Sequence, residues 1–210
     1  MVRSTNMMRE KITEVQEPTL DTLKHEGIAA FDVGLTAEET NAIENVSIEV
    51  EPEDFDYYGN SESELQNSVQ KHLLNLGPNN AEILETIARL ATRVVEETKA
   101  RFQKTSAWIT LRVFLPSTDH DTPRWHSDGH YVKHEDDEFV SEEYKLVFAI
   151  KGAPTRFQDF DVSKGQAALY RVGEQGKNIH SEPRITEPRI FMSVIVGSEA
   201  QIAELKSRFH

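Results

Sequence analysis

The chain has 210 residues, 38% of them hydrophobic, and this supply of apolar side chains suits one compact domain rather than two independent ones. Its 36 acidic and 23 basic residues give a formal charge of −13, which argues against nucleic acid or an anionic membrane surface as a partner. There is no cysteine, so any metal must be held by His, Asp or Glu. No apolar run reaches the length of a signal peptide or a membrane span, and we therefore expect a soluble, cytoplasmic protein.

The first half of the chain carries the helical period and is predicted to be mainly helical. Residues 27–33 have the pattern of a short strand, and Thr36 followed by Glu39 three positions later is a capping box, which opens a helix. Apolar side chains spaced three and four apart then predict two longer helices. The helices are expected over residues 36–45, 61–76 and 80–103.

The negative charge is concentrated before residue 107. Residues 1–106 hold 10 basic and 20 acidic side chains, whereas residues 107–210 hold 13 and 16. The densest stretch, from Glu49 to Glu64, contains seven carboxylates and no basic residue. A run of like charges is typical of a solvated segment, so we predict a loop there and assign it no chemistry.

After Ser106 the apolar residues recur at every second position, which is the period of strands. Many short strands separated by glycine and proline turns predict a barrel or a sandwich, followed by a C-terminal helix. The sequence thus predicts a single α+β domain with a mainly helical flank (1–106), a β core (107–197) and a terminal helix (198–210). The strands are expected over residues 108–115, 144–150, 166–172 and 189–196, with shorter extended pieces near 124–128, 155–160 and 178–181.

Residues that bind metals stand at the start of this β half. His126 and Asp128 are two positions apart, and such residues project to the same side of an extended segment. An imidazole and a carboxylate are two of the three ligands of a facial triad, which leaves open positions on ferrous iron. His180, 54 residues later at the edge of another extended piece, is the candidate for the third ligand.

An arginine follows the distal histidine at a short interval. Arg189 lies nine residues beyond His180 and opens an otherwise apolar strand, where a buried charge is costly without a partner. A bound dicarboxylate could be that partner, held by a charge-assisted fork of hydrogen bonds. The other interpretation is a surface ion pair with Glu187 or with another surface acid.

An alternative set of metal ligands lies within residues 120–134. The five potential ligands of this segment could hold zinc without His180. The acidic residues 136–138 indicate a solvated loop after this segment, so we favour the first set and expect His130 and Tyr131 to border the site. The five are His120, His126, Asp128, His130 and His134.

Trp108 and Arg112 share one face of the first core strand, opposite its aliphatic face. If that face points into the barrel, both side chains line the pocket. In the other arrangement, Trp108 packs under the long helix. The sequence leaves these two alternatives open.

His126, Asp128, His180 and Arg189, in this order, resemble the motif of the iron(II)- and 2-oxoglutarate-dependent dioxygenases, whose core is a double-stranded β-helix, or jelly roll. The resemblance implies that the first three residues bind Fe²⁺ and that Arg189 binds the far carboxylate of 2-oxoglutarate. Residues 144–157 and 179–184 are most similar to an uncharacterised bacterial branch of this superfamily.

The chain departs from the family pattern beside the arginine. Members often carry a hydroxyl two residues after it, where this chain has Phe191, and Ser193 is the next hydroxyl on the same face. Lys145, on an earlier strand, is a further cation for the cosubstrate, because some members use such a residue.

The resemblance implies oxidation of a C–H bond in a small-molecule or peptide substrate, coupled to conversion of 2-oxoglutarate into succinate and carbon dioxide. Two alternatives are a cupin-like metalloenzyme that does not use 2-oxoglutarate and a non-catalytic acidic interaction module on the same barrel. We also expect Asp128→Ala to be at least as stable as the unmetallated wild type, because it would relieve repulsion in an acidic cluster.

Overall fold

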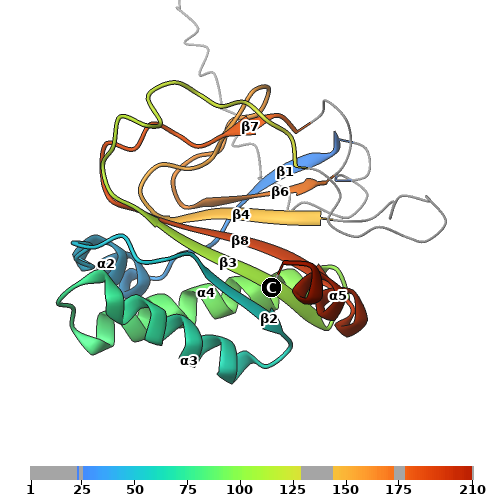
Figure 1. Cartoon of the computed structure of the whole chain (residues 1–210), viewed down its shortest axis with the longest axis horizontal. Coiled ribbons are helices and arrows are strands. Elements are labelled where there is room, and N and C mark those ends of the chain that lie inside the picture. The colour runs from blue at the N-terminus through green and yellow to red at the C-terminus, as the bar shows by residue number, and fades with distance from the viewer. Residues whose placement is uncertain (1–22, 24–25, 129–143, 173–177, 210) are drawn as a thin grey trace, which may run out of the picture.

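The computed structural model describes residues 23, 26–128, 144–172 and 178–209 (Figure 1). A large antiparallel sheet lies at its centre, with helices α2, α3 and α4 on one side and the short strand β7 on the other. The elements are β1 (Ile28–Asp32), α2 (Ala37–Asn45), β2 (Phe55–Gly59), α3 (Glu62–Leu73), the 3-10 turn η1 (Leu74–Leu76), α4 (Ala81–Arg101), β3 (Ser106–Phe114), β4 (Tyr144–Lys151), β5 (Arg156–Phe157), β6 (Gln166–Arg171), β7 (His180–Ser181), β8 (Arg189–Gly197) and α5 (Glu199–Phe209).

The large sheet has six strands in the order β1-β6-β4-β8-β3-β2, and every neighbouring pair is antiparallel. Strands β5 and β7 form a separate two-stranded sheet. An isolated backbone pair between His126 and His180 adds the segment before residue 129 to this smaller sheet. The extended piece expected over 124–128 is therefore reduced to one bridge, whereas the four longer strands of the second half are confirmed.

The helices begin where the sequence predicts. The Thr36 hydroxyl accepts a hydrogen bond from the Glu39 amide at 3.1 Å, and the Glu39 carboxylate accepts one from the Thr36 amide at 2.8 Å, which completes the capping box. The Ser61 hydroxyl caps α3 by accepting from the Glu64 amide at 3.3 Å, and the Asn80 side-chain oxygen caps α4 by accepting from the Glu82 amide at 3.0 Å. None of the helices in the described residues combines the length and apolar character needed to cross a membrane.

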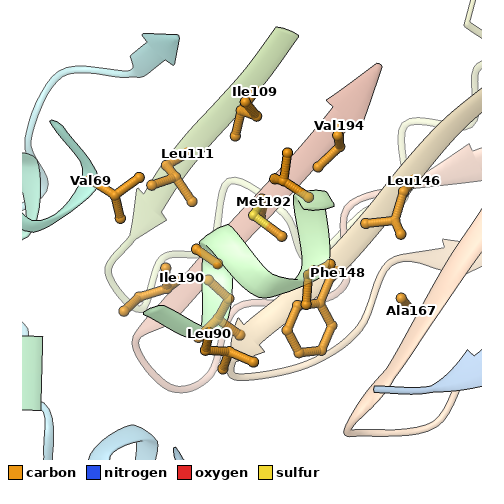
Figure 2. Close-up of a cluster of buried hydrophobic side chains, with 14 of the residues drawn as sticks. Val69, Leu90, Ile109, Leu111, Leu146, Phe148, Ala167, Ile190, Met192 and Val194 are labelled. Carbon is orange, nitrogen blue, oxygen red and sulfur yellow. The ribbon is translucent and has the colours of Figure 1, made fainter. Parts of the chain in front are cut away.

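The main core lies between α3 and α4 and one face of the large sheet (Figure 2). Leu90 of α4 is fully buried and shares this core with Met192 of β8 and Phe148 of β4. Full burial of such side chains contributes about 1.5–3 kcal/mol each. The alternate residues of β3 and β8 that face this core are Ile109, Leu111, Ile190, Met192 and Val194.

The acidic stretch is not the loop that its charge predicts. Strand β2 forms inside it and pairs with β3 as the last strand of the sheet. Aromatic residues favour strands, and Phe55, Tyr57 and Tyr58 supply three within five positions. The neighbouring carboxylates have partners on β3, because Asp54 forms an ion pair with Arg112 at 2.8 Å. The prediction of a solvated loop is therefore wrong for residues 55–59.

Candidate functional site

A cavity of about 420 Å³ opens on the face of the large sheet opposite the helical core. Pockets that bind small molecules have volumes of this order. Because side chains alternate along a strand, β3 and β8 give one set of residues to the core and the other set to this cavity. The second set includes Trp108, Thr110, Arg112, Arg189, Phe191 and Ser193.

His126, Asp128 and His180 meet at one end of the cavity, as the sequence predicts. Their potential ligand atoms all lie within 4.8 Å of one another, and His180 Nε2 is 3.7 Å from Asp128 Oδ2. The two histidines are cross-strand neighbours that exchange both backbone hydrogen bonds, at 3.0 and 2.8 Å. This pairing joins segments that lie 54 residues apart and fixes both imidazoles on one side.

Hydrogen bonds to the backbone orient both imidazole rings. His126 Nδ1 lies 2.9 Å from the carbonyl oxygen of Arg124, and His180 Nδ1 lies 2.9 Å from that of Asn178. A carbonyl oxygen can only accept, so each Nδ1 carries a proton, and Nε2 is the ring nitrogen left to face a metal. Burial lowers the pKa of His180, which favours the neutral ring that metals require.

Two donors hold the Asp128 carboxylate. Lys145 Nζ lies 2.9 Å from Asp128 Oδ2, and the Tyr170 hydroxyl donates to the same oxygen at 2.5 Å. Burial alone would raise the pKa of Asp128, but the Lys145 charge and the Tyr170 hydrogen bond outweigh it and hold the pKa below its usual value. The premise that Asp128 stands in a repulsive acidic cluster is therefore wrong, because its closest neighbours stabilise its charge.

The Arg189 guanidinium is buried beside the same cavity. Its side chain is 1% exposed, its Nε donates to the Ala153 carbonyl at 2.9 Å, and one terminal nitrogen donates to the Thr155 hydroxyl at 3.3 Å. The group also lies over the rings of Phe191 and Phe114, 4.6 and 5.5 Å from their centroids. These contacts fix its orientation without neutralising its charge.

Among the described residues, no carboxylate forms an ion pair with Arg189, and the alternative pairing with Glu187 is not found. Burial lowers the pKa of Arg189 to about 10, and the charge of Glu182, another cavity residue, opposes this shift. The guanidinium therefore stays charged near neutral pH and presents a positive group to the cavity.

A turn after β4 makes room for the arginine. Gly152 has a φ of +88°, which other residues adopt only with strain, and a Cβ there would lie 3.0 Å from Arg189 Cβ. The same turn delivers Thr155, so a hydroxyl does contact the arginine although position 191 carries none. Sequence spacing did not identify Thr155, because it comes from a different strand connection.

Trp108 and Arg112 both line the cavity, so the face of β3 that they share points into it and not toward the long helix. The Trp108 indole N–H and the Thr110 hydroxyl donate to Asp56 Oδ1 at 2.8 and 2.7 Å. Phe209 of α5 also lines the cavity. Asp56 and Phe209 do not follow from the sequence pattern, and the only signal for Asp56 is the aromatic pattern around it within the acidic run.

The single-segment zinc alternative gains no support. His126, Asp128 and His180 are the only group of three potential ligands within the described ranges, and His120 instead lies edge-on to Phe114 at 5.7 Å. His130, Tyr131 and His134 lie outside the described residues.

No family model matches the chain, and no curated protein matches it. Solved structures do match, 71 chains in all. A rice dioxygenase for auxin oxidation is 12% identical, with a TM-score of 0.48, over 84% of this chain and 75% of that one. A Pseudomonas putida prolyl-4-hydroxylase is 14% identical, with a TM-score of 0.43, over 85% of this chain and 96% of that one.

The viral collagen prolyl hydroxylase of Paramecium Bursaria Chlorella virus-1, in a complex with 2OG, is 13% identical, with a TM-score of 0.42, over 81% of this chain and 96% of that one. The chain is thus similar to solved structures of a dioxygenase and of prolyl hydroxylases.

Proposed function

We propose that the chain is an iron(II)- and 2-oxoglutarate-dependent oxygenase that oxidises a C–H bond of a small-molecule or peptide substrate. One observation carries the proposal: the same cavity is lined by three residues whose ligand atoms converge and by the buried guanidinium of Arg189. Among the described residues, no carboxylate forms an ion pair with that guanidinium. A metal site alone would not need the guanidinium, and a structural arginine would not need to face a cavity.

The donor set fits ferrous iron. Two imidazole nitrogens and one carboxylate oxygen form the facial arrangement that leaves open coordination positions. Both rings already have their Nδ1 protons engaged, which is the usual support of metal-binding histidines. Asp128 Oδ1 accepts no hydrogen bond from the described residues and is the oxygen available to a cation.

The Arg189 surroundings fit the distal carboxylate of 2-oxoglutarate. The guanidinium would bind that carboxylate through charge-assisted hydrogen bonds, with Thr155 and the Phe191 ring holding it in place. Ser193 lines the cavity on the same strand and is assigned as a further hydroxyl for the cosubstrate. Lys145 forms an ion pair with Asp128 in this structure, and we assign it as a second cation of the cosubstrate site.

The path of the chain supports the double-stranded β-helix. From β3 onward, successive extended segments alternate between the large and the small sheet: β3, the His126 bridge, β4, β5, β6, β7 and β8. Alternation of this kind places two facing sheets around one cavity, as in a jelly roll. It also brings His126 and His180 together in the small sheet, opposite Lys145 and Tyr170 of the large one.

When bound, iron and 2-oxoglutarate supply the oxidising power for C–H oxidation with dioxygen. The protein's own groups bind and orient. Tyr170 and Lys145 fix the Asp128 carboxylate, so that its free oxygen keeps one direction. Phe191 and Val147 give the cavity apolar walls, which limit the access of water to the reacting carbon.

Anaerobic titration tests the proposal. Metal-free protein mixed with ferrous iron and 2-oxoglutarate is expected to develop a visible charge-transfer band. His180→Ala should lose the band because one ligand is missing, and Arg189→Met should require far more 2-oxoglutarate to reach it. The matched control is His120→Ala, which removes a histidine outside the triad and should leave the band unchanged.

A protein that binds neither iron nor 2-oxoglutarate would contradict the proposal and support the acidic interaction module. Iron binding that is indifferent to 2-oxoglutarate and to Arg189→Met would contradict it in favour of a cupin-like metalloenzyme. If the band forms, release of succinate with candidate small molecules and peptides measures the coupled reaction.

A further inference from the structure

The end of the cavity remote from the triad holds a fixed carboxylate. Asp56 Oδ1 accepts hydrogen bonds from Trp108 and Thr110, which locks the orientation of the side chain. Among the described residues no donor contacts Asp56 Oδ2, and Asp56 is half-buried in the cavity wall. A carboxylate oxygen held in this way is ready to accept from a ligand.

Aromatic rings surround this carboxylate. Tyr58 and Trp108 stack at 5.3 Å between centroids, and Trp108 and Phe209 stack at 5.2 Å. All three residues line the cavity, and Phe209 is 50% exposed at the end of the stack. Trp108 is stacked by both neighbours, and Arg208 already lies over the Phe209 ring at 5.7 Å from its centroid. The stack therefore supplies an aromatic wall, and the Asp56 carboxylate is the group that attracts a cation to it.

The arginine and lysine side chains that line the cavity have other partners. Arg112 forms an ion pair with Asp54 at 2.8 Å, and Lys145 forms one with Asp128 at 2.9 Å. Arg189 would bind the cosubstrate carboxylate. Asp56 is therefore a cavity carboxylate that no described arginine or lysine neutralises.

The register of the sheet gives the distance across the cavity from Asp56 on β2 to the strand β4. Asp56 on β2, Thr110 on β3, Ser193 on β8 and Val147 on β4 are successive partners in one row. Neighbouring strands lie about 4.8 Å apart, so three steps separate β2 from β4 by roughly 14 Å. The triad lies over β4 and β6, where Lys145 and Tyr170 reach Asp128.

From these observations we infer that Asp56, with the Tyr58–Trp108–Phe209 stack, binds a positively charged group of the substrate, an ammonium or a guanidinium. The oxidised carbon lies toward the triad, so the substrate is an elongated amine, or a peptide with a basic side chain. This inference rests on the proposed function for its reaction, but the binding of the cation does not require metal.

Matched probes that differ in charge test the inference. N-acetyl-arginine methylamide is compared with its neutral citrulline counterpart, and N-acetyl-lysine methylamide with its norleucine counterpart. Dissociation constants are measured by ligand-observed NMR on full-length protein treated with chelator. Each cationic probe is expected to bind about tenfold or more tightly than its neutral partner, the size of a charge-assisted hydrogen bond.

The variant Asp56→Asn tests whether Asp56 causes the tighter binding of the cationic probes. The asparagine carbonyl can still accept from Trp108 and Thr110, while the charge of the free oxygen is lost. The cationic advantage should fall to within about twofold, with neutral probes unaffected. The control is Glu53→Gln, which makes the same change in net charge at an exposed neighbouring position and should preserve the advantage.

Equal binding of the two members of each pair to wild type would overturn the inference, and this comparison needs no variant. A cationic advantage that persists in a folded Asp56→Asn would also overturn it. Failure of the proposed function is a separate result, because it is the absence of the iron and 2-oxoglutarate band in wild type. If the band forms, cationic probes that raise succinate release more than their neutral partners support the assignment of substrate class.

Discussion

The two faces of the large sheet differ in chemistry although the same strands build both. On β8, Ile190, Met192 and Val194 point into the helical core (Figure 2), whereas Arg189 and Ser193 line the cavity. The core face is apolar and closed by α3 and α4, and the cavity face carries charges and hydroxyls.

The two-residue period of the strand thus separates the residues that stabilise the fold from those that line the cavity. A shift of register by one residue would exchange the two faces, so the apolar side also fixes where the polar side points. Changes on the core face should therefore alter the free energy of unfolding, and changes on the cavity face should mainly alter ligand binding.

The largest effect on stability is expected for Leu90→Ala on the core side. Leu90 is fully buried, and truncation of such a leucine costs about 2–5 kcal/mol of the free energy of unfolding. Chemical denaturation followed by circular dichroism measures the loss. Leu74→Ala, at a leucine that is 60% exposed, is the matched control and should change stability by less than about 0.5 kcal/mol. Similar losses of stability in the two variants would contradict the assignment of the core face as the stabilising side of the sheet.

On the cavity side, Arg189→Met should weaken ligand binding without lowering stability. Affinity for 2-oxoglutarate is expected to fall about a hundredfold or more, on the order of 3 kcal/mol, because a buried charge pair with the ligand is lost. The ligand-free protein should unfold at the same or a higher temperature, since a buried unneutralised cation gives way to an apolar chain. Arg184→Met, at an exposed arginine paired with Asp121, should change neither quantity. A large loss of stability in Arg189→Met would mean that the arginine is structural.

Asp128→Ala is expected to cost both metal binding and some stability. Without the carboxylate, the ion pair of Lys145 with Asp128 and the hydrogen bond of Tyr170 to the same oxygen are lost, which costs about 1–3 kcal/mol in the presence of chelator. His126→Ala should also abolish metal binding but should lose less stability, because its exposed ring donates to a backbone carbonyl and contacts the His180 ring but holds no buried charge. A melting temperature of Asp128→Ala at or above wild type would reject this account of the site.

The smallest effect concerns an ionisable group in the helical layer. Burial lowers the pKa of His72, although the charge of Asp54 opposes the shift. Below its ordinary pKa near 6.5, the unfolded chain thus binds more protons than the folded one, and stability falls as the pH falls. The slope from this group stays under about 1.4 kcal/mol per pH unit. His72→Phe should flatten the stability curve between pH 7.5 and 5.5, and an unchanged curve would contradict the assignment. His120→Gln is the control.

The sequence predicted most of this architecture because period and residue type are local. The capping box of Thr36, the helical face containing Leu90 and the alternation along β3 and β8 all follow from neighbouring residues. His126 and Asp128 could be paired because an extended backbone places them on one side. His180 could be proposed only from its order in the chain and its residue type.

The missed features depend on contacts between distant segments. Thr155 reaches Arg189 across a turn, and Asp56 is fixed by side chains of β3 more than 50 residues away. Strand β2 was missed because its charged surroundings mask an aromatic pattern that is strand-forming only once β3 is there to pair with it. Local periodicity contains none of this information.

The position of β2 at the border of the sheet has a consequence for solubility. An outermost strand offers unpaired backbone groups that a second chain can use to extend the sheet, which is a route to aggregation. Asp54 lies directly before β2, Asp56 lies within it, and the surrounding stretch from Glu49 to Glu64 has no basic residue. If the β2 edges of two copies approached each other, the acidic runs of both chains would repel. The acidic run therefore also opposes aggregation through this edge.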